Sequence, residues 1–363
     1  AQLYGSQTGI SYYQTGNADL RWEKQNIYDF GFDMSLFNRI SFTAAYWSKK
    51  NSDIVLSAPT PPSLGIPWNV ISQNVGAVEN HGLEFELGGS VYKSKQFSYT
   101  ASLNFSTQNN KVTELLSDMT YEHYIIRKGE SMRSLYGYQY QGVNMANGYP
   151  LYKKADGSIV QGNPTDSKYY LYDASNPTKM GTASSLTASD KVVLGNTIPK
   201  WFGGFDNTLK YKDFDMNIFF RFSGGNKIAN VTRRDMMTMY FQNNSTEILD
   251  RWQSPDEPGN GKVPIIISDK GSFLNLEADG SSRWLEDGDF LKLQNLSLGY
   301  TLPKNIADKL TFNQVRVYVQ AQNLFTITNY SGLDPEVYTT TLGVDWNGNP
   351  QQRSFTFGLN VVF

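Results

Sequence analysis

Apolar side chains recur at every second position through most of this chain of 363 residues. In the stretch "FDMNIFFRF" one face carries Phe214, Met216, Ile218, Phe220 and Phe222. The last stretch, "RSFTFGLNVVF", keeps the same period to the final residue. Side chains of a β-strand alternate between two faces, whereas a helical face repeats about every 3.6 residues. The pattern therefore predicts an all-β protein.

Short and long connections alternate between the predicted strands. The short connections lie near residues 37–39, 93–96, 128–132, 212–213 and 303–310. The long ones lie near residues 57–74, 107–120, 145–195, 228–285 and 329–350. Most Gly-, Pro-, Asn- and Asp-rich turn sequences fall in the long connections. This order predicts antiparallel strands that run up and down, with all the long loops at one rim.

About 11 strands are expected from Leu20 onward. Their ranges are 20–36, 39–56, 75–92, 97–106, 121–127, 133–144, 199–211, 214–227, 287–302, 313–327 and 351–363. Residues 121–127 alternate least, and we include them because without them the turn at 93–96 falls at the wrong rim. The alternation slips near Gln294, which predicts a β-bulge. Helical segments are expected near 230–250 and 303–310.

Alternation alone fits two architectures. A soluble lectin-like β-sandwich packs its apolar face inward, whereas an outer-membrane barrel turns that face to lipid and its polar face to a wet lumen. Here the polar face is rich in Ser, Thr, Gly, Asn and Gln and poor in Lys and Glu. Tyr and Phe often stand at strand ends, as in an interfacial girdle. With the long loops at one rim, these features favour an antiparallel transmembrane β-barrel.

The expected strand number also bears on closure of the barrel. Bacterial single-chain barrels mostly have an even number of strands, and an open sheet edge is not tolerated in lipid. An odd number therefore indicates that these residues do not close a barrel alone. We expect one continuous region over residues 1–363, the C-terminal part of a larger barrel completed by residues outside this chain.

Composition and charge narrow the function classes. The chain has 32 Lys and Arg against 34 Asp and Glu, a balance that gives no reason to expect a nucleic-acid partner. It has no cysteine, which excludes disulfides and cysteine-ligated metals. No apolar run is long enough for a transmembrane helix. The opening "AQLYGSQTG" lacks the basic and apolar regions of a signal peptide, so we expect either a processed product or a protein that is not exported.

Several longer stretches resemble the SusC/RagA family of TonB-dependent outer-membrane transporters of Bacteroidetes. They are "NVGAVENHGLEFEL" (74–87), "LGNTIPKWFGGFDNTLKYKDFDMNIFFRFSGGNKI" (194–228), "RWLEDGDFLKLQNLSLGYTLP" (283–303), "VRVYVQAQNLFTITNYSGLDPEV" (315–337) and the terminal "RSFTFGLNVVF". The matches run from about Ala18 to Phe363 in the family's order. The family's carboxypeptidase-like extension, TonB box, plug and early barrel strands have no counterpart here.

The resemblance implies a fold, partners and cargo. The family's barrel has 22 strands around a plug, so this chain would be about half of it, with the other half in another chain. The implied partners are a SusD-like surface lipoprotein as lid, TonB acting through the plug, and the lipid bilayer. The implied cargo is an oligosaccharide, with an oligopeptide as the alternative. The terminal Phe363 resembles the C-terminal aromatic signal for outer-membrane assembly, so its deletion should impair assembly more than ligand affinity.

No catalytic constellation is found, and no cofactor is expected. The only histidines, His81 and His123, fall in unrelated predicted strands, which argues against a His-based metal site or triad. Glu84 and Glu86 share one face and fit either a cation site or lumen-facing carboxylates against a plug. The stretches "KKADGS" and "EADGSS" lack the glutamate of a calcium loop and read as turns. A barrel enzyme is therefore disfavoured.

Binding by the long loops is more plausible than catalysis. Flat aromatic side chains stack on sugar rings and on peptide side chains, although each one alone fits packing between loops as well. The candidate ligand-binding residues are Trp68, Tyr169, Tyr170, Tyr240, Trp252, Tyr338 and Trp346, and Tyr172, Phe241 and Tyr330 also look exposed. Arg221 and Arg316 join Glu84 and Glu86 as expected lumen-facing residues. A soluble carbohydrate-binding β protein remains the alternative to a transporter.

Overall fold

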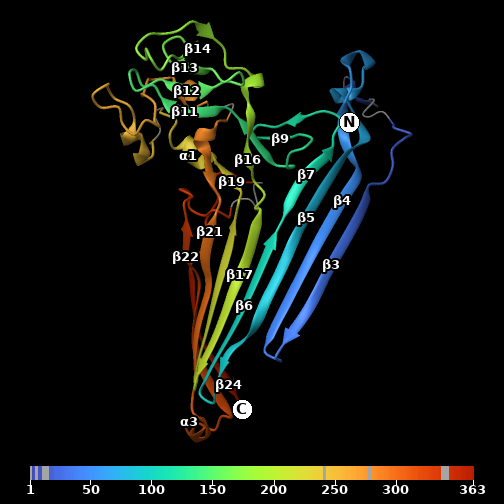
Figure 1. Ribbon diagram of the computed structural model, residues 1–363, viewed down its shortest axis with the longest axis vertical. Coiled ribbons are helices and arrows are strands. Elements are labelled where there is room, and N and C mark those ends of the chain that lie inside the picture. The colour runs from blue at the N-terminus through green and yellow to red at the C-terminus, as the bar shows by residue number, and fades with distance from the viewer. Residues whose placement is uncertain (1, 5–6, 10–15, 240–242, 277–279, 337–342) are drawn as a thin grey trace.

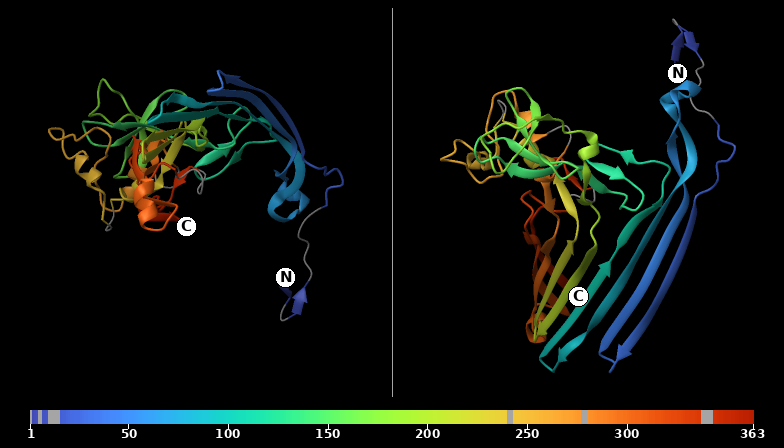
Figure 2. Two further views of the ribbon diagram at one scale, coloured as in Figure 1. Left: turned by 90° about the horizontal axis from the view of Figure 1, so that it is seen from below. Right: turned by 45° about the horizontal axis from the view of Figure 1, so that its top comes forward.

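The computed structural model describes residues 2–4, 7–9, 16–239, 243–276, 280–336 and 343–363. A long, curved, ten-stranded antiparallel sheet dominates it, in the order β24-β22-β21-β18-β17-β6-β5-β4-β3, with β7 also paired to β5 (Figures 1 and 2). The strands are β3 (Lys24–Leu36), β4 (Ile40–Pro59), β5 (Val70–Lys93), β6 (Phe97–Thr107), β7 (Asn109–Glu114), β17 (Trp201–Tyr211), β18 (Phe214–Gly224), β21 (Phe290–Thr301), β22 (Gln314–Thr328) and β24 (Ser354–Val362). The predicted all-β antiparallel barrel wall is confirmed.

The two ends of the sheet differ as predicted, except that the short connection expected at 128–132 lies at the end with the long connections (Figure 1). One end, here called the turn rim, carries the connections 37–39, 94–96 and 212–213 and the short helix α3 (Lys304–Lys309). The other end, the loop rim, carries the long connections, which fold into small sheets and short helices. Within the described residues, β3 pairs only with β4 and β24 only with β22, so the wall has two open edges.

Three small sheets and several short helices make up the loop rim. The sheet strands are β8 (Met119–Thr120), β9 (Tyr124–Ile126), β10 (Ser134–Gly137), β16 (Val192–Asn196), β11 (Gln139–Val143), β12 (Pro150–Lys153), β13 (Ile159–Asn163), β14 (Lys168–Leu171), β15 (Ala183–Ser184), β19 (Lys227–Asn230), β20 (Leu285–Asp287) and β23 (Val344–Asp345). The helices are α1 (Val231–Asp235), α2 (Gly271–Asn275) and the 3₁₀ turns Pro62–Leu64, Pro67–Asn69, Ala188–Asp190, Thr246–Asp250 and Ser282–Trp284. A separate hairpin joins β1 (Gln2–Tyr4) and β2 (Gln7–Gly9). No helix in the described part of the chain is both long and apolar enough to cross a bilayer.

Two of the predicted wall strands are wrong. Strand β6 pairs directly with β17 along its whole length, so nothing lies between them. The ranges 121–127 and 133–144 instead form parts of the small loop-rim sheets, as β9, β10 and β11. The turn at 93–96 still falls at the turn rim. The wall lacks two of the predicted strands rather than one, so the strands that follow keep their predicted up or down directions. Alternation in these segments reflects packing within the loops.

Other local predictions are confirmed. The pairing of β21 with β22 shifts register between Leu293 and Asn295, at the expected bulge. Helix α3 falls inside the expected segment 303–310. In the described residues of the segment 230–250 (230–239 and 243–250), the helical elements are α1 and one 3₁₀ turn, both about one turn long.

The apolar face of the wall is open, and the hydrophobic cores lie elsewhere. Phe30, Val317 and Phe357 are all exposed, and Phe357 reaches 81%. Three clusters of buried apolar residues occur in the described residues, and all three are built from loop-rim segments around Leu135, Tyr152 and Met237. A soluble sandwich would cover its apolar face with a second layer, and no described segment does so here.

The opposite face is a hydrogen-bonded polar surface. Asn217 on β18 donates to both carboxylate oxygens of Asp206 on β17, at 3.0 Å each. Asn295 on β21 donates to Asn217 Oδ1 at 3.2 Å, and Gln320 on β22 donates to Asn295 Oδ1 at 2.7 Å. This ladder crosses four strands and pairs their polar side chains with one another, which stiffens the wall.

Small residues on the polar face make room for large ones. Gly358 lies opposite Tyr318 in register, and a Cβ at Gly358 would sit 2.1 Å from Tyr318 Cζ. We expect Gly358→Val to lower the free energy of unfolding by about 1–3 kcal/mol through overpacking, measured as the thermal midpoint of the purified protein. Gly88→Ala is the control, because its Cβ would meet only the side chains of Ser41 and Ser102, whose hydroxyl oxygens lie at 3.3 and 3.4 Å and whose nearest carbon lies at 3.7 Å. Equal midpoints for both variants would contradict this.

Candidate ligand-binding site

A cleft of about 540 Å³, lined by both polar and apolar side chains, opens where the polar face meets the loop rim. We call it the rim cleft. Its polar lining residues are Glu23, Asn51, Asn80, Gln108, Asn110, Arg133 and Thr197, and its apolar ones are Ile54, Val78, Met132, Ile198 and Pro199. Asn80 lies on the polar face, because it follows the same alternation along β5 as Glu84 and Glu86. The cleft has the size of an ordinary small-ligand pocket.

Hydrogen bonds hold the lining of the rim cleft in place. Asn110 Nδ2 donates to Asn80 Oδ1 at 2.6 Å, while Asn110 Oδ1 accepts from the backbone N–H of Met132 at 2.7 Å. Gln108 Nε2 donates to the carbonyl of Pro199 at 2.9 Å. Asn110 of β7 and Gln108, the residue before β7, thereby tie this part of the wall to two later loop segments. The result is a surface of fixed amides between one acidic and one basic side chain.

The four residues expected to face the lumen all lie on the polar face. Glu84 and Glu86 alternate with the apolar Leu83 and Phe85, and Glu86 lies opposite Asn104. In the described ranges no group of three or more His, Asp or Glu residues stands close enough to hold a metal. That both carboxylates face a lumen stays a prediction.

Both arginines are paired with carboxylates. Arg316 on β22 binds Asp215 on β18 through two hydrogen bonds, of 2.9 Å from Nε and 2.5 Å from Nη2. Arg221 on β18 lies in register with Lys292 on β21, and its Nη1 is 2.8 Å from Glu336 Oε1. Each pair links elements that are far apart in sequence.

The "SGLDPE" stretch (331–336) fastens the last long loop to the wall. Lys292 of β21 is only 2% exposed, and its ammonium contacts the carboxylates of Glu336 and, at 3.4 Å, Asp334. Gln351 completes the contact, because its backbone N–H donates to Asp334 at 3.2 Å. The buried Lys292 ammonium therefore holds the start of this loop against strand β21.

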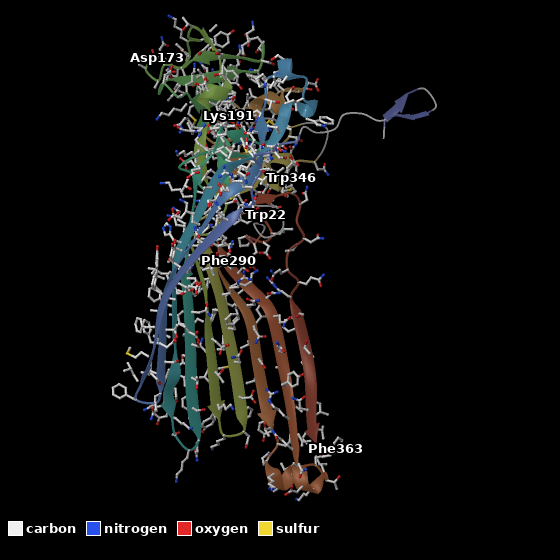
Figure 3. All side chains as sticks on the ribbon, turned by 90° about the vertical axis from the view of Figure 1, so that its right-hand side faces the viewer. Trp22, Asp173, Lys191, Phe290, Trp346 and Phe363 are labelled. Carbon is white, nitrogen blue, oxygen red and sulfur yellow. The ribbon has the colours of Figure 1, made fainter. Side chains whose placement is uncertain are left out.

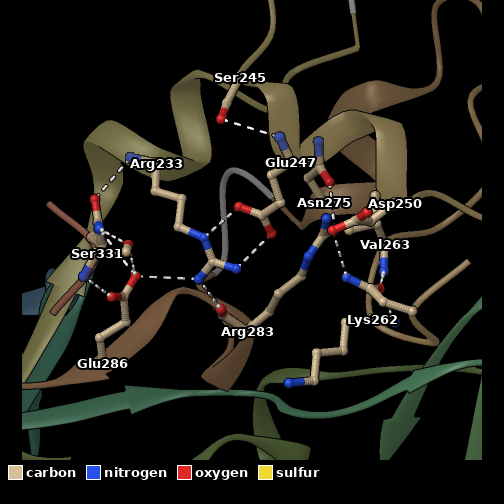
Figure 4. A network of polar contacts seen from close by, with 12 residues as sticks. Arg233, Ser245, Glu247, Asp250, Lys262, Val263, Asn275, Arg283, Glu286 and Ser331 are labelled. Atoms are coloured by element: carbon tan, nitrogen blue, oxygen red, sulfur yellow. Dashed lines mark hydrogen bonds and ion pairs between the residues drawn. The ribbon is translucent and has the colours of Figure 1, made fainter. Parts of the chain in front are cut away.

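A second network couples the "RWLEDG" stretch (283–288) to the same loop (Figure 4). Arg233 of α1 donates to both oxygens of Glu247, at 2.7 and 2.6 Å, and to Glu286 Oε1 at 3.2 Å. Glu286 in turn accepts from the N–H and the hydroxyl of Ser331, at 2.7 and 2.8 Å. Two family-like motifs thus meet around one arginine, although 45 positions separate Glu286 from Ser331.

Acid should weaken this network. Burial raises the pKa of Glu247, but the hydrogen-bonded Arg233 guanidinium lowers it more, so the net shift is downward. A depressed folded pKa stabilises the fold above the ordinary glutamate value of about 4.3, and this stability is lost as the pH falls through the folded pKa. We expect amide hydrogen exchange in α1 and in residues 246–250 to accelerate as the pH drops below about 4.3, after correction for the intrinsic rate.

The variant Glu247→Gln provides the comparison. It should destabilise the loop by about 1–3 kcal/mol at pH 7, because a hydrogen-bonded charge is removed. It should also lose the acid-dependent part of the exchange. An identical pH profile for both proteins would show that Glu247 does not carry the effect.

Arg283 is a buried residue whose environment the sequence did not disclose. It is 8% exposed, its guanidinium lies over the rings of Trp284 (4.3 Å) and Tyr140 (5.5 Å), and Nη1 donates to Asn275 at 2.7 Å. Its Nε and Nη2 have no hydrogen-bond partner among the described residues. Burial lowers the pKa of the Arg283 guanidinium. Burial also raises the pKa of the Tyr140 phenol, to about 12. The only signal in the sequence was its place at the start of the "RWLEDG" stretch.

The loop aromatics divide into packed and exposed residues. The expected exposure is wrong for Trp252, which is 8% exposed with its indole N–H donated to the carbonyl of Met145, and for Tyr330, which is also buried. Tyr169 packs between Tyr152 and Phe273. The structure brings these side chains into the loop cores, where burial of large rings stabilises the small sheets.

The remaining aromatics lie at the surface or outside the described residues. Trp68 is 81% exposed and lies in the β4–β5 connection, two residues before β5 begins. Trp346, labelled in Figure 3, is 47% exposed, and its ring lies beside that of His123. Tyr170 is half-buried and donates its hydroxyl to Asp166, which raises the pKa of the phenol. Tyr240 and Tyr338 fall outside the described residues. Phe363 lies at the turn rim, 85% exposed, with its ring against Phe312.

Comparisons with known proteins agree with this geometry. Residues 1–324 match the family described as TonB dependent receptor-like, beta-barrel. The chain is 30% identical to TonB-dependent receptor P3 of Formosa agariphila, over 98% of this chain and 36% of that protein. It is 26% identical to TonB-dependent receptor SusC of Bacteroides thetaiotaomicron, over 98% of this chain and 34% of SusC.

Solved structures show the same likeness. The structure of the RagAB peptide transporter superposes with a TM-score of 0.79 at 25% identity, covering 99% of this chain and 38% of the matched chain. The RagAB peptide importer in its open-open state gives a TM-score of 0.76 at 25% identity, over 98% of this chain and 36% of that one. The chain thus spans about a third of the length of the curated relatives it matches.

Proposed function

Because the chain belongs to the TonB-dependent receptor β-barrel family, as a barrel portion of the SusC/RagA type, we propose that it forms part of the wall of an outer-membrane nutrient importer. The observation that carries the proposal is the two-sided sheet. Its apolar face is open, and its polar face is hydrogen-bonded and ends in the rim cleft. Such a sheet suits lipid on one side and a water-filled, plugged lumen on the other.

The same proposal assigns directions and partners. The loop rim faces the outside of the cell and the turn rim faces the periplasm. A plug and the other barrel strands, outside this chain, meet the polar face and the two open edges. Energy comes from TonB through the plug, and a SusD-like lipoprotein covers the loop rim. The RagAB and SusC likenesses support these assignments.

We propose an oligosaccharide as the cargo held near the loop rim. The amides of Asn51, Asn80 and Asn110 offer fixed donors and acceptors for hydroxyl groups, and the exposed rings of Trp68 and Trp346 suit stacking on sugars. A peptide is the second candidate. The rim cleft also carries Glu23 and Arg133, which suit the charged ends of a peptide, and the neighbouring RagAB structure is titled a peptide transporter.

Uptake by cells that carry the intact transporter tests both cargoes. Radiolabelled oligosaccharide and oligopeptide pools are given to parent cells, to cells without the transporter and to cells without TonB. We expect uptake of one pool only, and only in the parent. Equal uptake by cells without the transporter would overturn the proposal.

Variants then assign the cargo to the rim cleft. Asn80→Ala with Asn110→Ala should reduce uptake of either cargo. Glu23→Gln with Arg133→Gln should reduce peptide uptake and leave oligosaccharide uptake unchanged. Trp68→Ala with Trp346→Ala tests the loop aromatics, and Trp22→Ala is the control because this ring is exposed and is not one of the candidates. Unchanged uptake and unchanged lid binding in the Trp68 and Trp346 double variant would refute the aromatic assignment.

A further inference from the structure

The apolar face of the wall contains a groove close to the turn rim. Its volume is about 510 Å³. Leu87, Val91, Leu103 and Phe205 form its sides, and Gly89 and Ala101 form its floor. Phe37 and Arg39, from the β3–β4 turn, close its lower end. The groove is therefore an apolar trough with one cation at the end nearest the turn rim.

The floor of the groove follows from register and side-chain size. Gly89 and Ala101 are paired partners, and the next pair on the same face is Leu87 with Leu103. Phe205 continues that row on β17. Two small residues beside a row of large ones leave a hollow in an otherwise filled surface. Gly89 cannot be replaced by a larger residue without strain, because a Cβ there would lie 2.3 Å from the carbonyl oxygen of Arg39.

The charged residue at the end of the groove, Arg39, has no carboxylate partner among the described residues. Its side chain is exposed, and its Nη2 is 3.4 Å from the carbonyl of Ser90. Arg316, by contrast, is held by Asp215 on the polar face. A guanidinium without a carboxylate partner at a membrane surface has bidentate donors left for a phosphate.

We propose that this groove binds one glycerophospholipid of the periplasmic leaflet. An acyl chain lies over Gly89 and Ala101, and the phosphate accepts hydrogen bonds from Arg39. The inference rests on the proposed outer-membrane placement, which puts the apolar face in hydrocarbon and the turn rim at the periplasmic headgroups. Charge complementarity favours a phospholipid over a second protein as the occupant. The groove is apolar along its length and ends at one cation, Arg39, at the level expected for lipid headgroups.

A second hollow on the same face provides a matched comparison. It has a volume of about 310 Å³ and is lined by Leu298, Val317, Val319 and Phe357, without a charged side chain. Ordinary lipid contact would occupy both hollows alike. The proposal predicts that only the groove at Arg39 retains a phospholipid when bulk lipid is removed.

Native mass spectrometry of the intact transporter tests this. The protein is purified in mild detergent, exposed to phosphatidylglycerol and measured for retained lipid. We expect the parent protein to retain one lipid. The variants Ala101→Phe, which fills the groove, and Arg39→Gln, which removes the charge-assisted hydrogen bonds, should each bind the lipid at least about tenfold more weakly. Val319→Phe in the second hollow and Lys212→Gln at the turn rim should retain the lipid as the parent does.

The outcomes separate the possibilities. Equal retention in all five proteins would overturn the proposal. Loss in Ala101→Phe but not in Arg39→Gln would show an acyl chain or detergent without headgroup recognition, which also overturns it. Arg39 lies in an exposed turn, so its variant tests the idea even if Ala101→Phe fails to fold. A protein that stays soluble without detergent would refute the membrane placement itself, whereas unchanged lipid retention in a membrane-bound barrel refutes only this inference.

Discussion

Phe357→Arg should prevent or strongly reduce assembly of the barrel in the outer membrane. Phe357 lies midway along β24 on the apolar face, opposite Val319, and is 81% exposed. If that face meets lipid, an arginine there costs about 2–4 kcal/mol. That is a large share of a typical net stability of about 5–15 kcal/mol. The measurement is the amount of folded protein in outer-membrane fractions, read by heat-dependent migration in gels.

The neighbouring Thr356 supplies the control. It lies on the polar face, opposite Gln320, so Thr356→Arg puts the same charge one residue away but toward the proposed lumen. We expect this variant to assemble in nearly normal amounts. Equal assembly of both variants would refute the assignment of the apolar face to lipid, and equal failure would point to a general intolerance of β24 to arginine.

Glu336→Met should produce the second large effect. It leaves the ammonium of Lys292 buried, with Asp334 at 3.4 Å as its remaining carboxylate. Breaking a buried ion pair on one side costs about 3–5 kcal/mol, and Asp334 should keep the loss near the lower limit. Arg221 also loses its partner, but its side chain is one-third exposed and can be hydrated. We expect the loop at 329–353 to become sensitive to protease and the thermal midpoint to fall.

The double variant Lys292→Met, Glu336→Met tests the cause. If the damage comes from an uncompensated cation, removing that cation should restore much of the midpoint. A double variant that is as unstable as Glu336→Met alone would show that packing of the Glu336 side chain, rather than charge, holds the loop.

The strand pattern was readable from the sequence because alternation is a local property. The period of two assigns each side chain to a face whatever the strand pairs with. For this reason the faces of β18, β22 and β24 and the bulge after Leu293 were predicted correctly. The two rims were also predicted correctly, except for the short connection expected at 128–132, which lies between β9 and β10 at the loop rim. The same local character explains the error at 121–127 and 133–144, since a strand in a small loop sheet alternates like a strand in the wall.

The site was less accessible from the sequence. The face of Arg221, Arg316, Glu84 and Glu86 followed from alternation, but their partners did not. Trp252 and Trp68 are the same residue type in loops of similar composition, yet one is buried and one is exposed. Exposure of a loop side chain depends on which distant segment folds over it, and no local pattern carries that information.

The sequence by itself thus determined the strands, the two faces of the wall and the rim that carries the loops, because these depend on neighbouring residues alone. Only the tertiary structure decided which strands form the wall, how Lys292 and Arg233 fasten the last loop, and where the rim cleft and the groove at Arg39 open. These features join residues tens of positions apart. Their free energies come from long-range pairing and burial, which exist only once the chain has folded.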